Sequence, residues 1–266
     1  MRHGNPTLFH AASSYYSMVA RYALCLSQIN YDSRLMDIHQ KREQLQDWYI
    51  AINPSMTVPA LQTTDQVYDS STDIVRFAQA TAPEQWFESH ASPSQLEAIN
   101  RLVQSHDAFE VERLTFNALM HKLPPLRLAF PHLLRKVCRQ LRQQIEAAAP
   151  HVEALQAKLA VNEARLDYFA GQPLAARQAK QIELTQTFLQ PFGQAPSGTW
   201  LFGEKPSHAD VVLVVFLARL RMVGLLGSVG VPSAFVQWLE QKTQTPAFKD
   251  ADIWVKLQPL RLLSHR

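Results

Sequence analysis

The pattern of hydrophobic and polar residues changes once along this chain, between residues 82 and 93. Before that point, short apolar runs at 7–10, 31–37, 58–61 and 67–68 alternate with stretches of helical spacing, which predicts strands separated by helices. After it, apolar residues recur every three or four positions and no strand signal returns. We expect a small mixed sheet flanked by helices, followed by an all-helical part. The polar, proline-bearing stretch between them predicts two domains, residues 1–82 and 93–266.

Three features organise the predicted helical part. Residues 94–120 read as one helix, which the Leu123-Pro124-Pro125 step ends. Apolar residues recur at helical spacing over 133–145 and again over 152–159, so Pro150 between them should kink a helix or start a new one. Further along, an S-x-x-D capping box at 207–210 precedes a run, 211–217, that is apolar on every side. That run predicts a helix at the centre of the second domain.

The Val58-Pro59 step stands where a strand should begin. Proline there removes one ladder donor and keeps the preceding residue extended, which only edge strands or special turns tolerate. Taken alone, such a step is most often an ordinary trans proline that opens an edge strand. A cis bond would instead turn the Val58 backbone outward and leave its N–H and C=O free to pair with the backbone of a bound peptide. The residues by themselves leave both interpretations open.

Serines at predicted helix starts are the second candidate for chemistry. Ser13, Ser14 and Ser17 stand where the helix after the first strand begins, and Ser70 stands three residues before Asp73 at the start of another helix. Serine in such a position ordinarily caps the helix by accepting from its first N–H groups. The same positive helix end also attracts anions, and a hydroxyl there can donate to a thiolate and lower its pKa. Both roles stay open for these serines.

Composition and charge exclude several classes of protein. A hydrophobic content of 47% and only 8 glycines indicate an ordinary globular, helix-rich protein. The net charge of +3 is small for 266 residues. The densest basic group, Arg135, Lys136, Arg139 and Arg142, falls at the spacing of one solvated helix face. We therefore expect no nucleic-acid partner.

Cysteines, histidines and apolar runs bear on the cellular compartment, on metal binding and on membrane insertion. Cys25 and Cys138 each lie in a helix-like pattern, so we expect no disulfide and a reducing, cytoplasmic compartment. The histidines are too scattered for a recognisable ligand spacing, so no metal is expected. Residues 1–6 show no apolar signal region, and the longest apolar run, 211–229, contains Arg219 and Arg221 near its middle. We therefore expect no integral membrane segment.

Three motifs, in their order and separation, resemble the glutathione transferase superfamily. They are Asn-Pro-x-x-x-Val-Pro-x-Leu at 53–61, Ser-Ser-x-x-Ile at 70–74 and Gly-x-x-x-Ser-x-Ala-Asp at 203–210. The resemblance covers nearly the whole chain and implies the fold class α/β + all-α. It implies a thioredoxin-like N-terminal domain with a cis bond before Pro59, and an all-helical C-terminal domain. The long stretch 133–189 and the Trp-Leu-Phe-Gly segment at 200–203 are similar to two branches, the ganglioside-induced differentiation-associated protein-like and the tetrachlorohydroquinone-dehalogenase-like transferases.

The resemblance implies glutathione as co-substrate and assigns its backbone contacts. Val58, held by Pro59, would pair with the cysteinyl backbone, and Ser71 would hold the γ-glutamyl carboxylate. Ser70 stands where the family usually has an acidic residue that contacts the γ-glutamyl amine, and the neighbouring Asp69 would compensate for it.

The same resemblance implies which residue contacts the glutathione sulfur. Ser14 opens a Ser-Tyr-Tyr-Ser segment that is similar to the family's S-P-x-S segment, with Tyr15 in place of the proline. Ser14 would then activate the glutathione sulfur, and Ser17 is the second choice.

Two functions follow from the resemblance. In the first, the protein is a detoxifying transferase that joins the glutathione thiolate to a small hydrophobic electrophile, or displaces halide from it, in a pocket of the helical domain around residues 117–130. In the second, it is a catalytically weak, transferase-like binding or regulatory protein. Ser70, the absent proline at Tyr15 and the extended helical region favour that alternative. The resemblance implies a homodimer.

Overall fold

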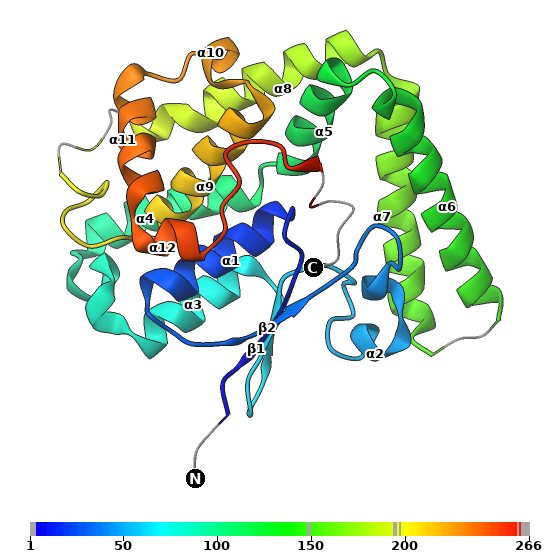
Figure 1. Cartoon of the computed structure of the whole chain (residues 1–266), viewed down its shortest axis with the longest axis horizontal. Helices are drawn as coiled ribbons and strands as arrows, with labels where there is room; N and C mark the ends of the chain where they lie inside the picture. Colours follow the sequence, from blue (N-terminus) through cyan, green and yellow to red (C-terminus); the bar gives the residue numbers. More distant parts are fainter. Residues whose placement is uncertain (1–3, 148–149, 194–195, 197, 260, 262–266) are drawn as a thin grey trace.

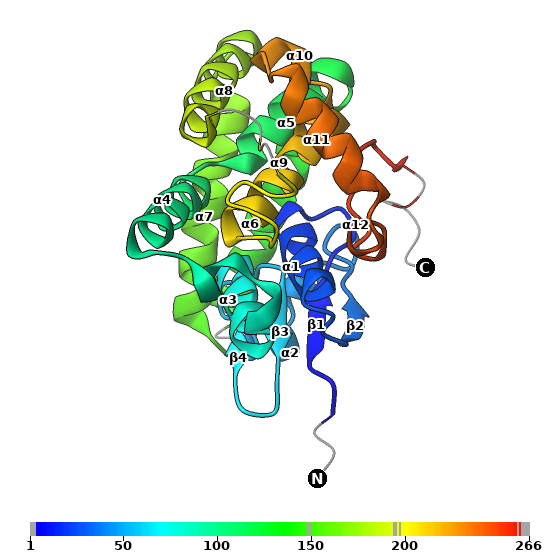
Figure 2. The same ribbon diagram turned by 90° about the vertical axis from the view of Figure 1, so that its left-hand side faces the viewer.

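The computed structural model describes residues 4–147, 150–193, 196, 198–259 and 261. The first three residues of the predicted N-terminal segment lie outside these ranges. A small sheet with its helices occupies one end of the molecule and a larger helical body the other, as Figures 1 and 2 show from two sides. The predicted class, a thioredoxin-like domain followed by an all-helical domain, is confirmed.

Four strands form the sheet in the order β2-β1-β3-β4 (Figure 2). They are β1 (Thr7–His10), β2 (Asp32–Leu35), β3 (Ala60–Gln62) and β4 (Val67–Tyr68). β1 pairs with β2 in parallel and with β3 in antiparallel register, Phe9 lying opposite Ala60. Because side chains alternate along a strand, Leu8 and Phe9 point to opposite faces. Leu8 joins the core under α1 (Tyr15–Leu26) and α3 (Ser71–Thr81), whereas Phe9 packs with Tyr49 of α2 (Asp47–Ile50).

The Val58-Pro59 peptide bond is cis, as the resemblance implies. Hydrogen bonds from a buried side chain hold the loop before this bond. Asn53 is completely buried, and its side-chain amide donates to the main-chain oxygens of Thr57 at 3.0 Å and Asp69 at 3.3 Å. Its Oδ1 accepts from the Ser55 N–H at 2.9 Å, and the Tyr49 hydroxyl also donates to the Thr57 oxygen. One asparagine therefore fixes both the loop before the cis bond and the segment that leads into α3.

In its described residues the second domain consists of helices joined by loops, with one isolated β-bridge between Trp200 and Gly203. Its helices are α4 (Pro93–Asp107), α5 (Val111–Lys122), α6 (Leu126–Glu146), α7 (Val152–Gly171), α8 (Leu174–Leu189), α9 (His208–Val223), α10 (Leu226–Val229), α11 (Ser233–Gln244) and α12 (Pro246–Asp250). The predicted capping box is present: Ser207 accepts from the Asp210 N–H, and the Asp210 carboxylate accepts from the Ser207 N–H at 2.8 Å. Helix α9 is buried along nearly its whole length, so the expectation of a central helix is confirmed.

One predicted helix is wrong. Residues 94–120 form α4 and α5, separated by a break at 108–110. Phe109 turns into the core there, with its ring 5.1 Å from Phe188 and 5.3 Å from Phe216. Just before the break, His106 is bound to α1. Tertiary packing of these side chains outweighs a helical periodicity that runs through the break unchanged.

Helices α6 and α7 form a long antiparallel hairpin at one side of the molecule (Figure 1). Its far end packs against the first domain: Leu141 and Leu155 form a buried cluster with Leu45, Ile50 and Met56. Two polar contacts reinforce that packing, from the Gln144 amide to the Leu45 oxygen and from the Lys158 ammonium to the Ser55 oxygen. The hairpin thus supports the loop that leads to the cis proline.

Candidate active site

The predicted site residues gather where β1 ends and β3 begins. Because Phe9 pairs with Ala60, the turn after β1, residues 11–13, lies across from Val58 and Pro59. Ser14 ends that turn and caps α1. Ser70 caps α3 on the other side of β3, beyond β4. The strand order therefore sets Val58 between the two helix starts.

Ser14 and Ser17 differ in what their hydroxyls do. The Ser14 Oγ accepts from the Ser17 N–H at 3.3 Å and keeps its own hydrogen for donation, and its side chain is partly exposed. Ser17 is completely buried, and its Oγ accepts from the Ala11 N–H at 3.3 Å. Of the two predicted residues, only Ser14 can meet a ligand without rearrangement of the turn.

The main chain of Val58 offers a donor and an acceptor. In the described part of the chain, neither its N–H nor its C=O makes a hydrogen bond, and its side chain is half-buried against Tyr49 and Ile38. Polar backbone groups in folded proteins are nearly always paired with protein, water or ligand. An extended peptide laid along Val58 could pair with both groups.

Ser70 and Ser71 begin α3 in different ways. The Ser70 hydroxyl accepts from the Asp73 N–H at 3.1 Å and donates to the Asp73 carboxylate at 2.7 Å, so it is engaged on both sides. Ser71 is 6% exposed, and its N–H is among the first donors of the helix, which point to the positive end of the helix dipole. Asp69 is exposed beside them. The α3 start can hold a carboxylate through Ser71, while an amine would meet Asp69 rather than Ser70.

Two buried arginines hold the turn between β1 and Ser14. Arg21 donates through Nη1 and Nη2 to the oxygens of Ala11 and Ala12, each at 3.3 Å, and through Nε and Nη2 to the oxygens of Ala251 and Asp252 just after α12. Arg219, from the middle of α9, donates to the Ser13 oxygen at 3.0 Å. All three carbonyls of the turn are therefore bonded to guanidinium groups.

Arg21 also fixes His10 at the end of β1. Its Nη1 lies 3.0 Å from His10 Nδ1, and because a guanidinium only donates, that ring nitrogen accepts. His10 Nε2 then donates to the Ser33 hydroxyl at 2.7 Å. Burial, and secondarily the Arg21 charge, lower the pKa of His10 to about 3, so its ring is neutral.

A chain of hydrogen bonds joins the starts of α1 and α3 through the end of α4. The Asp107 carboxylate accepts from Thr72 at 3.0 Å and lies 3.2 Å from His106 Nδ1. His106 Nε2 lies 2.9 Å from the Tyr15 hydroxyl. Although burial raises it, the hydrogen bonds from His106 and Thr72 keep the pKa of Asp107 below its ordinary value. The Asp107 carboxylate accepts from His106 Nδ1, and the contact between His106 Nε2 and the Tyr15 hydroxyl completes the link, so the two helix starts keep a constant separation.

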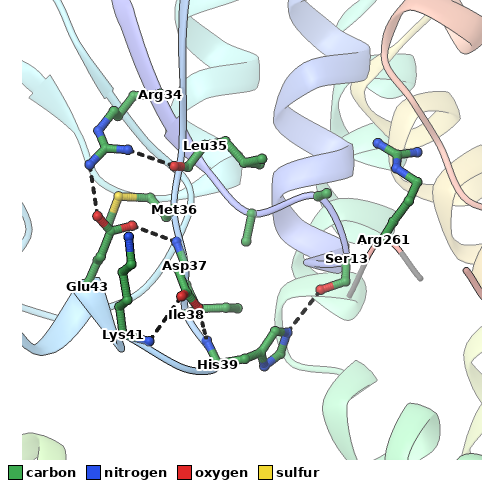
Figure 3. A pocket seen from close by; sticks show the side chains of 12 residues that line it. Ser13, Arg34, Leu35, Met36, Asp37, Ile38, His39, Lys41, Glu43 and Arg261 are labelled. Carbon is green, nitrogen blue, oxygen red and sulfur yellow. Dashed lines mark hydrogen bonds and ion pairs between the residues drawn. The ribbon is translucent and has the colours of Figure 1, made fainter. Parts of the chain in front are cut away.

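Beyond Ser13, on the β2 side, lies a polar cavity of about 200 Å³ (Figure 3). The turn 11–13, the segment after β2 and Arg261 line it. Asp37 is held by the N–H groups of three following residues, and Glu43 bridges the Arg34 guanidinium and the Asp37 N–H. Lys41 and His39 complete the lining, and the Ser13 hydroxyl reaches His39 at 3.4 Å. This end of the site thus carries the cationic side chains of Arg34, Lys41 and Arg261 together with the carboxylates of Asp37 and Glu43, and Arg34 is paired with Glu43 and Arg261 with Asp252.

Packed side chains occupy part of the region 117–130, where the electrophile pocket is predicted. Asn117 is 1% exposed and donates to the Tyr168 hydroxyl, and Phe130 stacks on Phe116 at 3.9 Å. These side chains fill the core between α5, α6 and α7 instead. A cavity of about 400 Å³ lies elsewhere in the helical domain, between the turn joining α4 to α5 and α8, lined by Phe109, Leu184 and Phe188 among others.

Within the described ranges, no three His, Cys, Asp or Glu side chains come together as a metal site would require. No helix there is long and apolar enough to cross a membrane. The basic group at 135–142 is exposed, as predicted, along α6.

Sequence reasoning missed the arginines and the histidine chain at this site. The scattered histidines predict no site, although His106 lies in this chain of hydrogen bonds, and the sequence uses Arg219 only as evidence against a membrane span. A signal for Arg219 was present, because a cation in the middle of an otherwise apolar helix calls for a buried acceptor.

Fold and site together define a thioredoxin-like domain with a cis-proline recognition loop, joined to a helical domain. Residues 8–86 match the N-terminal domain of glutathione S-transferase, and residues 139–241 match its C-terminal domain. The chain belongs to the glutathione S-transferase superfamily.

Solved structures of low sequence identity share the fold. A glutathione S-transferase from Xylella fastidiosa is 19% identical with a TM-score of 0.60, the match covering 93% of this chain and 97% of that one. The theta class enzyme from Xanthomonas axonopodis pv. citri, solved with glutathione bound, is 15% identical with a TM-score of 0.55, at the same coverage of 93% and 97%. FzlA from C. crescentus is 18% identical with a TM-score of 0.58, covering 93% of this chain and 92% of that one. No curated protein sequence matches the chain significantly. At these identities the likeness concerns the fold alone.

Proposed function

We propose that the protein binds glutathione across the end of its sheet and, as a transferase, activates the glutathione sulfur for attack on a small hydrophobic electrophile. The observation that carries the proposal is the cis Val58-Pro59 bond, which leaves the Val58 main chain unpaired within the described residues and lies between Ser14 and Ser71. In this proposal Val58 pairs with the cysteinyl backbone, and the start of α3 at Ser71 holds the γ-glutamyl carboxylate.

The dimensions of the sheet support a tripeptide in this orientation. The strand order β2-β1-β3-β4 sets Ser71 and the polar cavity at opposite sides, with Ser14 and Val58 between them. Three strand intervals span about 14 Å, and a γ-linked tripeptide, which is two carbon–carbon bonds longer than three α-linked residues of about 3.5 Å each, reaches about 13 Å. The glycine carboxylate would then enter the cavity lined by Lys41 and Arg261.

Ser14 is the proposed catalytic residue. Its hydroxyl caps α1, retains a hydrogen to donate and stands at the positive end of the helix dipole, and all of these favour a thiolate over a thiol. The thiolate is the nucleophile, so the remaining requirement is to hold the electrophile in line with it. Tyr15 and Tyr16, whose rings lie 5.1 Å apart, give the Ser14 neighbourhood an apolar, aromatic side.

Several finer features belong to the same proposal. The α6–α7 hairpin, which lengthens the helical domain, supports the resemblance to the ganglioside-induced differentiation-associated protein-like and tetrachlorohydroquinone-dehalogenase-like branches. Free Cys25 and Cys138 suit a reducing cytoplasm, and a detoxifying role and a homodimer follow from the family. The boundaries 1–82 and 93–266 accord with the end of α3 at Thr81 and the start of α4 at Pro93.

A binding or regulatory protein without turnover is the second candidate. One observation favours it: Ser70, which replaces the family's acidic residue, is uncharged and already donates to and accepts from Asp73, so it can offer the γ-glutamyl amine only one remaining lone pair. Calorimetry with glutathione separates the two functions, because tight binding without conjugation of any electrophile supports the second.

The test of the transferase uses calorimetry with glutathione and conjugation assays with aryl halides and activated alkenes. The wild-type protein should bind glutathione and turn over at least one of these electrophiles. Ser14→Ala should lower the rate about 10-fold to 1000-fold, as loss of one hydrogen-bond donor to a developing anion does elsewhere. Ser92→Ala is the matched control, since it removes an exposed hydroxyl that caps another helix, α4, outside the proposed site. Failure of the wild-type protein to bind glutathione would refute the proposal, and an undiminished rate in Ser14→Ala would refute the role of Ser14.

A further inference from the structure

Arg219 is a buried cation in an apolar helix. It lies in the middle of α9 and is 5% exposed, among neighbours that are nearly all hydrophobic. A buried charge is costly unless it is paired. In the part of the chain that the structure describes, no carboxylate lies within ion-pair distance of Arg219, and its Nε–H has no hydrogen-bond partner. The fold therefore keeps a positive charge here that no protein anion neutralises.

The contacts of Arg219 point to the start of α1. Its Nη2 donates to the Ser13 oxygen at 3.0 Å, and its guanidinium lies 5.6 Å from the centre of the Tyr15 ring. Ser14, between these two contacts, is the cap of α1 and the proposed thiol-activating residue. The second domain thus supplies a charge directly beneath the sulfur site of the first.

Arg21 serves as the structural comparison. It is equally buried, but its donors are all used on main-chain oxygens and on His10. Its role in shaping the turn is complete without a ligand. Arg219 makes only one of the turn's three carbonyl contacts and retains an unused N–H, so turn geometry alone does not account for it.

We propose that Arg219 is the electrostatic positioning residue for the glutathione sulfur, holding it as a thiolate at Ser14. This inference rests on the proposed binding of glutathione. In the step concerned, the S–H bond of glutathione breaks, the proton leaves to water, and the sulfur keeps the electron pair. The Ser14 hydroxyl then donates to that sulfur while the Arg219 charge and the α1 dipole stabilise it through space.

The groups that face Arg219 do not cancel its charge. Tyr15 is neutral, because burial raises its pKa well above the ordinary value. Asp107 is separated from Arg219 by His106 and the Tyr15 ring. Burial lowers the pKa of Arg219 to about 10, so the guanidinium remains protonated at neutral pH.

The size of the effect follows from the distances. The Ser13 oxygen is 3.0 Å from Nη2, and Ser14 is the next residue, so a sulfur bonded to its hydroxyl lies about 6 to 10 Å from the charge. At an effective dielectric constant of about 20, a unit charge at that distance lowers a thiol pKa by about 1 to 2 pH units.

The test measures the pH midpoint of thiolate absorbance near 240 nm in the glutathione complex. Arg219→Gln removes the charge, Arg219→Lys keeps it, and Arg221→Gln removes a charge from the same helix at an exposed ion pair with Glu240. We expect the midpoint to rise by about 1 to 2 pH units in Arg219→Gln, to stay within about half a unit in Arg219→Lys, and not to move in Arg221→Gln. Circular dichroism and the glutathione Kd report whether each variant is folded and binds.

The outcomes separate this inference from the proposed function. A merely structural Arg219 would weaken glutathione binding in both Arg219 variants without moving the midpoint, and that result would overturn the assignment alone. A wild-type protein that shows neither glutathione binding nor a thiolate band would overturn the proposed function and the assignment together. If Arg219→Gln does not fold, Arg219→Met, which replaces the buried cation by an apolar side chain of similar length, takes its place: a midpoint raised by about 1 to 2 pH units would support the assignment, and an unmoved one would overturn it.

Discussion

Replacement of Asn53 tests whether the cis-proline loop is held from inside. Asn53→Ala removes donors to the Thr57 oxygen at 3.0 Å and the Asp69 oxygen at 3.3 Å, and an acceptor for the Ser55 N–H at 2.9 Å. Each such bond contributes about 0.5 to 1.5 kcal/mol net. The Thr57 oxygen keeps its bond from Tyr49, so the other two partners decide the result. We expect the free energy of unfolding to fall by about 2 to 4 kcal/mol.

Because these bonds shape the loop that presents Val58, the same change should weaken glutathione binding at least about 10-fold, equal to about 1.4 kcal/mol. Urea unfolding at constant m-value gives the stability, and calorimetry gives the affinity. Asn5→Ala is the matched control, because Asn5 makes one exposed bond, to Asp32. A stability loss below about 1 kcal/mol, or an unchanged affinity in a clearly destabilised variant, would show that the tether does not govern the loop.

Three further predictions concern the rest of the fold. Burial is the main cause that lowers the pKa of both His10 and His208 to about 3, so on acidification the unfolded chain binds these protons before the folded chain does. The free energy of unfolding should therefore be highest above pH 6.5 and fall toward pH 3, with a loss of at most about 2 kcal/mol per histidine at pH 5. Unfolding midpoints that do not decline on acidification would contradict this prediction. Asp210→Ala, which removes the acceptor for the Leu201 and Ser207 N–H groups, should cost about 3 kcal/mol in urea unfolding, and a cost under about 1 kcal/mol would mean that the capping box is dispensable. Leu155→Ala should lower the free energy of unfolding by about 2 to 5 kcal/mol and also weaken glutathione binding, since Leu155 packs on the loop before the cis bond. An unaltered Kd would show that the α6–α7 hairpin contributes to stability but not to binding.

Local signals in the sequence predicted much of the fold. The capping boxes, the proline steps and the two hydrophobic periods identify most elements of both domains, because each depends on residues a few positions apart. The cis state of Val58-Pro59 was different: its own residues favour trans, and only the motifs around it reversed that expectation. The break at Phe109 escaped prediction because helical spacing continues through it and a tertiary contact causes it.

Some residues of the candidate site could likewise be predicted from the sequence, and others could not. Ser14, Val58 and Ser71 could be named in advance because short motifs mark them. Arg219 reaches Ser13 across 206 positions, and a hydrogen bond between such distant residues leaves no periodic trace in a single sequence. The exclusion of Ser17 likewise required its burial and its bond to Ala11 to be seen.

Arg21 bonds to a segment that is synthesised much later than Arg21 itself. Arg21 lies 230 positions before its partner oxygen at Ala251. At a synthesis rate of about 5 to 20 residues per second, the Arg21 side chain would wait roughly 10 to 50 seconds on the ribosome for that partner. Until then the guanidinium is hydrated and the turn before Ser14 lacks one of its anchors. A nascent chain can therefore form its sheet early, but the turn before Ser14 gains its bonds to the segment after α12 only when that segment has been made.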